Sequence, residues 1–431
     1  MTELQAAILL ADLALILAVA HGAGRIARML GQPAVIGEIV GGILVGPTFF
    51  DGAIALALFP LDVRPHLGAL ANLGLVLFMF VVGMEFDFGR LRGSGRIAGA
   101  TVIGSTLVPF ALGLPLALVL LREHEPAHRP AFMLFIGVAV SVTAFPVLAR
   151  ILTDRGMNGT WLGSVALSTA AICDLAAWLT LAAVQTLVGG SHENHWRVLL
   201  VVPYAVVLIV CVRPLLRRVL ARGRDERGLS AGLFAVVLPG ALVSAAVTQF
   251  LGLHFVIGAF LFGLVMPRRE HAPTREDLLR RTGHMTRLLL PVYFIVAGLK
   301  VDLSRIGSSG LWELALIMCV AVTGKFAGTW IAARSQGLPS RGSAVLATLM
   351  NTRGLTELIA LSVGLEAGLL DERLYSLFVV MAVVTTAMTG PLLLWLLGKG
   401  AQDRAGPPDG AIHGLTSAGH HAAMQHGDRP G

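Results

Sequence analysis

A series of apolar stretches, each about 20 residues long, covers almost the whole chain and restricts its fold more than any other feature. A helix of that length spans the hydrocarbon core of a bilayer. Charged residues make up only 14% of the 431 residues, whereas soluble domains average about 25%. The sequence therefore predicts an all-α integral membrane protein with one polytopic domain.

The apolar stretches predict about 13 transmembrane helices, at residues 3–29, 33–48, 67–89, 95–121, 129–153, 159–189, 196–220, 227–250, 253–267, 283–301, 306–335, 341–368 and 372–398. Lys and Arg are concentrated in every second connection, and the net charge is +7. Because basic residues mark cytoplasmic loops, we expect a multi-pass protein of the cell membrane, with its N-terminus outside and its C-terminus in the cytoplasm. This orientation accounts for the positive charge without a nucleic-acid partner.

Residues 1–398 are predicted to form the transmembrane domain. Residues 399–431 are rich in Gly, His and Pro and too poor in apolar residues to fold, so we predict a disordered cytoplasmic tail. The sequence contains no Walker-type GxxxxGK[ST] run, no HExxH and no GxSxG. We therefore expect no enzymatic activity, no cofactor and no bound metal.

One carboxylate lies near the middle of the sixth predicted span. Asp174 follows Cys173 and is surrounded by alanines, whose small side chains let another helix approach closely. An ionisable group at that depth is costly and marks a functional site by default. Asp174 is predicted to hold a proton or a cation in turn. The alternative is an Asp that is paired only for packing.

The fifth and twelfth spans contain residues that interrupt a continuous helix. Ser141, Thr143 and Pro146 occur together in the fifth span, and Arg353 and Glu357 flank a glycine in the twelfth. Proline removes a backbone donor, hydroxyls satisfy freed backbone groups, and irregular backbone at depth lines a protein-enclosed cavity. We predict that both helices are broken, with Ser141, Arg353 and Glu357 supporting the break.

The positions of the two broken spans indicate two inverted six-helix repeats, spans 1–6 and 8–13, in which the breaks cross near Asp174. Lys325 lies far from both ends of the eleventh span, so its amine cannot easily reach water. Two readings of Lys325 stay open. It neutralises helix-end dipoles as a structural ammonium, or it takes part in proton transfer.

Five runs in this order resemble the second branch of the monovalent cation/proton antiporter superfamily, which holds Kef-type transporters and plant cation/H⁺ exchangers of the sodium/hydrogen exchanger kind. The resemblance covers about residues 30–395, and its runs are Gly31–Ile39, Ser141–Arg150, Ala166–Trp178, Gly298–Asp302 and Met350–Leu358. It implies a homodimer in which a dimerisation domain holds an ion-carrying core, made mainly of residues 129–189 and 306–398.

The resemblance also implies that Asp174 is the ion-binding carboxylate, that Thr143 is the hydroxyl near the ion, and that Lys325 is the core lysine. This chain departs from the pattern at Cys173, where relatives carry Asp, Asn or Gln. We include Cys173 in the cation and proton site because of its position, although a thiol is a poor ligand for a hard cation. Without a second acid beside Asp174, we expect one proton per cation.

The sequence thus predicts alternating-access antiport of K⁺ or Na⁺ against protons, with both ions competing for Asp174. The expected partners are these ions and the lipid bilayer. The alternative is a channel-like K⁺ efflux pathway without obligatory proton coupling, which a test of coupling distinguishes.

Overall fold

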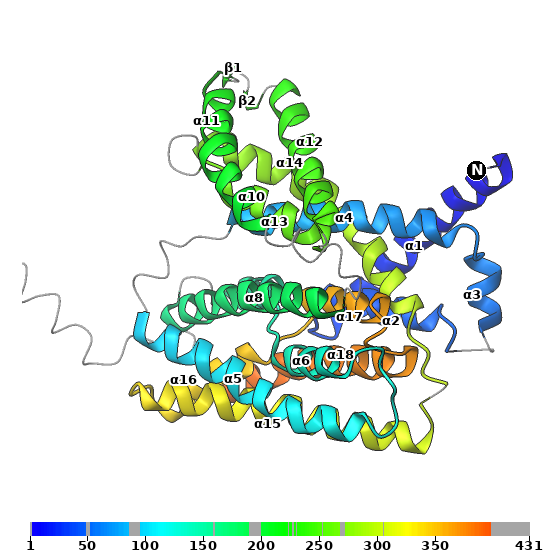
Figure 1. Ribbon diagram of the computed structural model, residues 1–431, viewed down its shortest axis with the longest axis vertical. Helices are drawn as coiled ribbons and strands as arrows, with labels where there is room; N and C mark the ends of the chain where they lie inside the picture. Colours follow the sequence, from blue (N-terminus) through cyan, green and yellow to red (C-terminus); the bar gives the residue numbers. More distant parts are fainter. Residues whose placement is uncertain are drawn as a thin grey trace, which may run out of the picture.

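The computed structural model in Figure 1 describes residues 2–48, 52–85, 95–157, 160–188, 200–222, 224–225, 228–229, 231–251, 253–267, 272–304 and 306–397. Nearly all of these residues are helical. Two short strands, β1 (Arg224–Asp225) and β2 (Gly228–Leu229), pair in antiparallel fashion. The predicted all-α membrane fold is confirmed. The tail predicted at 399–431 lies outside the described residues.

The helices before residue 190 follow the first six predicted spans, with an additional short α3. They are α1 (Glu3–Met29), α2 (Ala34–Leu44), α3 (Ala53–Leu58), α4 (Arg64–Glu85), α5 (Gly95–Leu120), α6 (Arg129–Ser141), α7 (Phe145–Asp154) and α8 (Trp161–Val188). The helices after residue 200 include one π-helical turn, η3. They are α10 (Val201–Val207), η3 (Leu208–Val212), α11 (Arg213–Arg222), α12 (Ala231–Phe250), α13 (Phe255–Val265), α14 (Ala272–Leu299), α15 (Gly307–Ser335), α16 (Ser340–Met350), α17 (Leu355–Glu366) and α18 (Glu372–Leu397).

Eight stretches of the described chain are helical, long and apolar enough to cross a membrane, and shorter apolar helices lie at Ala34–Leu44, Phe234–Phe250 and Phe255–Val265. The total of thirteen spans stays a prediction. The tenth predicted span begins earlier than expected, because α14 starts at Ala272 rather than at residue 283. We call the side of the molecule at which α1 begins the N-terminal face.

The helices pack in two groups (Figure 1). We call α5, α6, α7, α8, α15, α16, α17 and α18 the core bundle, since α5 packs on α15, α6 and α8, and α15 packs on α16 and α18. We call α1, α2, α4, α12, α13 and α14 the scaffold bundle, since α4 packs on α13 and α14, and α2 packs on α1 and α14. The core bundle contains the helices predicted for the core, together with α5.

Paired glycines bring the scaffold helices into close contact. A Cβ atom on Gly42 of α2 would lie 2.5 Å from the carbonyl oxygen of Ile295, and one on Gly298 of α14 would lie 2.5 Å from that of Ile39. Side chains larger than hydrogen are thus excluded from both helices at this crossing.

The same arrangement recurs where α4 crosses α13. A Cβ atom on Gly83 would lie 2.2 Å from the carbonyl oxygen of Phe260, and one on Gly263 would lie 2.2 Å from that of Phe80. These helices are the third and ninth predicted spans, whereas α2 and α14 are the second and tenth. Exchanging the two predicted repeats converts one crossing into the other, as inverted repeats require.

Both predicted helix breaks are present and cross each other. Residues 142–144 separate α6 from α7, and residues 351–354 separate α16 from α17. The backbone N–H of Ala144 donates to the carbonyl oxygen of Thr352 at 3.0 Å, so the two breaks are joined directly. Gly354 has φ +153°, and a Cβ atom there would lie 2.7 Å from a methyl group of Val147, so only glycine fits.

Candidate functional site

Asp174 lies on α8 where the two helix breaks meet. One carboxylate oxygen, Oδ2, accepts from the backbone N–H of Phe145 at 3.2 Å and from the hydroxyl of Thr356 at 3.4 Å. Phe145 is the first residue of α7, and Thr356 is in the first turn of α17. The N-termini of two half-helices, each the positive end of a helix dipole, therefore face one carboxylate. The sequence prediction that both breaks converge on Asp174 is confirmed.

The other carboxylate oxygen of Asp174 is different. Oδ1 is buried and has no hydrogen-bond partner among the residues that the structure describes. The residue as a whole is 8% exposed. A buried polar atom without a partner is costly, and the oxygen of a carboxylate satisfies itself by taking a proton or a cation. Oδ1 is thus the oxygen of Asp174 that could take a proton or a cation.

Thr143 and Lys325 form a second contact at the breaks. The amine of Lys325, fully buried on α15, donates to the Thr143 hydroxyl at 2.6 Å. That hydroxyl in turn donates to the carbonyl oxygen of Met350 at 3.0 Å, at the end of α16. Within the described chain no ion pair joins Lys325 to Asp174. Lys325 therefore contacts the crossing through Thr143. The Thr143 hydroxyl links it to the C-terminus of α16.

Cys173 precedes Asp174 but its thiol faces another helix. The sulfur lies 3.5 Å from the hydroxyl oxygen of Ser105 and 3.4 Å from that of Thr106, both on α5. Cys173 is buried. The position that relatives were expected to fill with a carboxylate or amide is therefore occupied by a thiol held between two neutral hydroxyls. Cys173 lies beside Asp174 in sequence, and its contacts tie α8 to α5.

Arg353 and Glu357 support the break at the end of α6. The guanidinium of Arg353 donates to the carbonyl oxygens of Ala139 at 2.7 Å and Val140 at 2.5 Å, and it pairs with Glu357 at 3.1 Å. Both side chains are fully buried. Carbonyls in the last turn of a helix have no intrahelical partner and form the negative end of its dipole. Arg353 satisfies them, and Glu357 balances its charge.

Ser141 also satisfies a carbonyl group in the last turn of α6. Its hydroxyl donates to the carbonyl oxygen of Val138 at 3.0 Å. The break around Arg353 is held from α18 by Thr386. The backbone N–H of Arg353 donates to the Thr386 hydroxyl at 2.9 Å, and this hydroxyl donates to the Arg353 carbonyl oxygen at 2.7 Å. Arg353, rather than Lys325, thus neutralises the C-terminus of α6.

Four residues with contacts at the site were not predicted from the sequence: Thr356, Thr386, Ser105 and Thr106. All four are hydroxyl residues in apolar segments, a kind that is common in membrane helices and commonly bonds only to its own backbone. Thr356 alone had a sequence signal, because it follows Gly354 within one turn of a predicted break. A hydroxyl at the start of a half-helix points toward the site that the break creates.

A family model described as "Sodium/hydrogen exchanger, transmembrane" matches residues 14–399. The Na(+)/H(+) antiporter NhaS4 of Synechocystis is 34% identical over 90% of this chain and 96% of its own length. The Cation/H(+) antiporter 20 of Arabidopsis thaliana is 36% identical over 90% of this chain, and the K(+)/H(+) antiporter 1 of Saccharomyces cerevisiae is 33% identical over 91%. The chain spans only 48% and 47% of these last two relatives.

Among solved structures, the sodium proton antiporter MjNhaP1 of Methanocaldococcus jannaschii has a similar fold. The TM-score is 0.69 at 14% sequence identity, and the match covers 92% of this chain and 100% of that one. At this identity the likeness concerns the fold alone.

Proposed function

This chain belongs to the sodium/hydrogen exchanger family, and we propose that it exchanges a monovalent cation, Na⁺ or K⁺, for protons across a membrane. The observation that carries the proposal is the free oxygen of Asp174, buried where two half-helix N-termini meet. Relatives of similar sequence are named as Na⁺/H⁺ and K⁺/H⁺ antiporters, so both cations remain candidate substrates. We assign no enzymatic chemistry to this site.

Proton and cation exclude each other at Asp174 in this proposal. A proton on Oδ1 neutralises the carboxyl group, and a cation bound to Oδ1 neutralises the carboxylate. An empty carboxylate is a net charge in a low-dielectric interior, which is costly to move through the membrane. The two loaded states therefore cross and the empty state does not, which couples the two fluxes.

The moving part in this proposal is the core bundle, which carries Asp174 past the scaffold bundle. Alternating access by one unit against the other fits inverted repeats with a site at their broken helices. We further propose that the protein is a homodimer in the lipid bilayer of the cell membrane, with the N-terminus outside and the C-terminus in the cytoplasm. The concentration of Lys and Arg in alternate connections supports this orientation.

The proposal is tested by dissipation of a pH gradient in proteoliposomes on addition of Na⁺, K⁺, Li⁺ or choline. We expect proton flux with at least one alkali cation and none with choline. Asp174→Asn should abolish the flux while the protein stays folded, because the amide oxygen still accepts from Phe145 and Thr356 but cannot exchange protons. Ser164→Ala, on the same helix, is the matched control.

Two results would contradict the proposal. One is cation-dependent proton flux near wild type in a folded Asp174→Asn protein. The other is cation movement that follows the imposed voltage with no accompanying proton flux, which is the behaviour of the channel-like alternative.

A further inference from the structure

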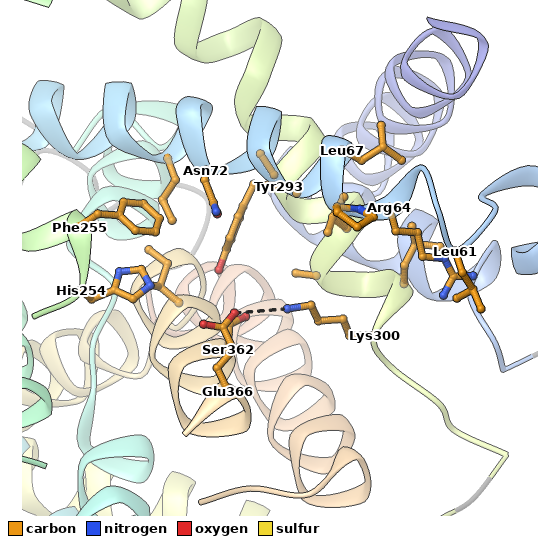
Figure 2. Close-up of a pocket in the computed structure, with 18 residues that line it drawn as sticks. Leu61, Arg64, Leu67, Asn72, His254, Phe255, Tyr293, Lys300, Ser362 and Glu366 are labelled. Carbon is orange, nitrogen blue, oxygen red and sulfur yellow. Dashed lines mark ion pairs between the residues drawn. The ribbon is translucent and has the colours of Figure 1, made fainter. Parts of the chain in front are cut away.

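A cavity of about 360 Å³ lies between the two bundles (Figure 2). Its walls are α4, α13 and the end of α14 from the scaffold bundle, and α17 from the core bundle. Arg64, Lys300 and Glu366, at or next to the ends of three of these helices, line the cavity. Because the side chains of Lys300 and Glu366 are partly exposed, we take this end as its mouth. The beginnings of α1 and α4 are joined by a hydrogen bond from Gln5 to Asp62. The cavity therefore opens on the N-terminal face.

The cavity follows α17 toward Asp174. Ile359, Ser362 and Glu366 of α17 line it at successive turns. Thr356, whose hydroxyl contacts Asp174, precedes Ile359 by three residues on the same helix. Glu366 follows Thr356 by ten residues, which corresponds to about 15 Å along the helix axis. The cavity thus reaches to within one helical turn of the site at Ile359, and Glu366 lies at the opposite end, at the mouth.

A charged pair at the mouth bridges the two bundles. The amine of Lys300, just beyond α14, lies 3.9 Å from a carboxylate oxygen of Glu366, the last residue of α17. Figure 2 shows the two side chains pointing toward each other across the cavity. Their side chains are 38% and 67% exposed, so each is free to act on an ion in the cavity.

Arg64, the other basic group at the mouth, is held by hydrogen bonds to backbone carbonyl oxygens. Arg64 donates to the carbonyl oxygens of Phe59 at 2.8 Å and Ala55 at 3.1 Å, so its guanidinium is directed at the backbone of α3 and the residue after it. Glu366 is the carboxylate that lines this cavity. Low-dielectric walls focus the field of charges in a cleft and change the local concentration of ions. The balance between Lys300 and Glu366 therefore governs how many cations the cavity holds.

We propose that Lys300 and Glu366 form a charge filter that sets how readily a cation reaches Asp174 from the N-terminal face. Glu366 attracts cations into the cavity, and Lys300 opposes this by pairing with Glu366 and by repelling cations. The inference rests on the proposed function in that Asp174 is the cation's destination. It adds a pair of residues that determines apparent affinity on one side of the membrane without contacting the bound ion.

Transport kinetics give the first test. A unit charge about 15 Å from a site changes ion occupancy about two- to sixfold, depending on the effective dielectric constant. Lys300→Gln should lower the half-saturating cation concentration by that factor, Glu366→Gln should raise it, and the double variant should lie near wild type. Maximal rates should stay unchanged. The shifts should shrink at high ionic strength, since exposed charges are screened.

Vesicles of both orientations separate this effect from a general one. The shifts should occur only when cation is added to the N-terminal face. Arg122→Gln and Glu123→Gln remove exposed charges on the same face outside the cavity and are the matched controls. Equal shifts in both orientations, shifts as large in the controls, or no shift in either variant would overturn the charge filter.

A second test is independent of transport. Ser362→Cys places a thiol on the cavity wall, in a background in which the exposed Cys211 and Cys319 are replaced by Ser and the buried Cys173 is kept. The ratio of modification rates by a cationic and an anionic methanethiosulfonate reagent then reports the field in the cavity. Lys300→Gln should raise this ratio and Glu366→Gln should lower it.

An unchanged ratio in both variants would refute the filter even if the protein exchanges ions normally. If the ratio shifts as expected while the wild-type protein shows no exchange, the exchange proposal fails and the filter stands as a property of the cavity. The two proposals can thus fail separately.

Discussion

The two oxygens of Asp174 have different surroundings, and this difference defines the site at the scale of single residues. Oδ2 is fixed by a backbone N–H and a hydroxyl, whereas Oδ1 is buried without a partner in the described chain. The contacts of the fixed oxygen hold the carboxylate group in place at the crossing. In the proposed mechanism, the free oxygen takes up the proton or the cation. Residues around Asp174 should therefore affect cation affinity mainly by positioning its carboxylate, and less by their own charge.

Thr143 offers a test of that distinction. Its hydroxyl accepts from Lys325 and donates to the Met350 carbonyl oxygen, which holds the crossing of the two breaks. A typical hydrogen bond contributes about 0.5–1.5 kcal/mol. Thr143→Ala should therefore raise the half-saturating cation concentration about two- to tenfold and leave exchange measurable in proteoliposomes. Thr143→Ser keeps the hydroxyl and should restore affinity. Complete loss of exchange in Thr143→Ala would show that Thr143 is indispensable and contradict this account.

Charged residues of the site could be predicted from the sequence, and its hydroxyls mostly could not. Asp174, Lys325, Arg353 and Glu357 stand out because a charge in an apolar stretch is costly. The partners of Cys173 could not be predicted, because they lie on α5 and nothing in the sequence indicates which face of α8 meets that helix. The role of Arg353 in capping α6 likewise depends on the crossing itself.

At the scale of elements, backbone approach at glycines sets how the long helices cross. In the core bundle, a Cβ atom on Gly104 of α5 would lie 2.3 Å from the carbonyl oxygen of Gly328 on α15. A Cβ atom on Gly99, also on α5, would meet nothing within 4 Å. The two positions therefore compare a packed glycine with an unpacked one in the same helix.

Gly104→Ala should destabilise the protein, because the methyl group would force α5 away from α15. Overpacking of this kind costs about 1–3 kcal/mol. Gly99→Ala should be neutral or stabilising by up to about 1 kcal/mol, since Ala favours helix more than Gly does. Thermal unfolding in detergent measures both. Equal melting temperatures for the two variants would contradict the close crossing.

A cluster of charged residues joins three elements at the N-terminal face. His124, after α5, bonds through Nδ1 to Asp371 at 2.5 Å and through Nε2 to Glu313 of α15 at 3.2 Å. Arg373 of α18 pairs with Glu313 at 3.0 Å. Burial alone would lower the pKa of His124, but the hydrogen bonds and negative charges of Asp371 and Glu313 outweigh burial and raise it. The charged imidazolium donates to both carboxylates.

This cluster predicts a pH-dependent contribution to stability. Because the pKa of His124 is raised in the folded protein, its contribution is complete below the ordinary value of 6.5 and is lost as pH rises through the folded pKa. His124→Gln should therefore lower the melting temperature at pH 6 and change it little at pH 9. His66→Gln, an exposed histidine on the same face, is the control. A loss that is equally large at both pH values would contradict the charged pair.

Hydropathy located the long helices well and the polar elements poorly. The first three turns of α14 contain several charged residues, so an apolar window misses them although they are helical. The six-residue α3 and the β1–β2 pair are too short to give any periodic signal. The broken helices were predictable because proline, glycine and buried charge occur together there.

At the scale of the whole molecule, single hydrogen bonds join the two bundles in addition to the Lys300–Glu366 pair. The Tyr375 hydroxyl of α18 donates to the Ala297 carbonyl oxygen of α14 at 3.1 Å, and Gln32, just after α1, donates to the Ala387 carbonyl oxygen of α18 at 3.1 Å. Single hydrogen bonds of this kind contribute about 1 kcal/mol each. Contacts of this strength are compatible with the proposed movement of one bundle past the other.

The charge moved per cycle follows from the groups that the core bundle carries. Cys173 is held by hydroxyls and supplies no second acid, so we predict one proton per monovalent cation and electroneutral exchange. With equal cation on both sides of a liposome, an imposed voltage should drive no proton flux. Cys173→Asp should make the exchange voltage-sensitive, if the second acid also cycles. Voltage-driven, cation-dependent acidification by the wild-type protein would refute the one-for-one ratio.

Competition between proton and cation for Asp174 is the central claim, and it is measured most directly by the cation dependence of the transport rate at several pH values, with equal pH on both sides. Competition predicts that the half-saturating cation concentration rises toward about tenfold for each unit by which pH falls, while the maximal rate of cation exchange stays constant. A half-saturating concentration independent of pH, with only the maximal rate changing, would show that the two ions bind at separate sites and would contradict competition at Asp174.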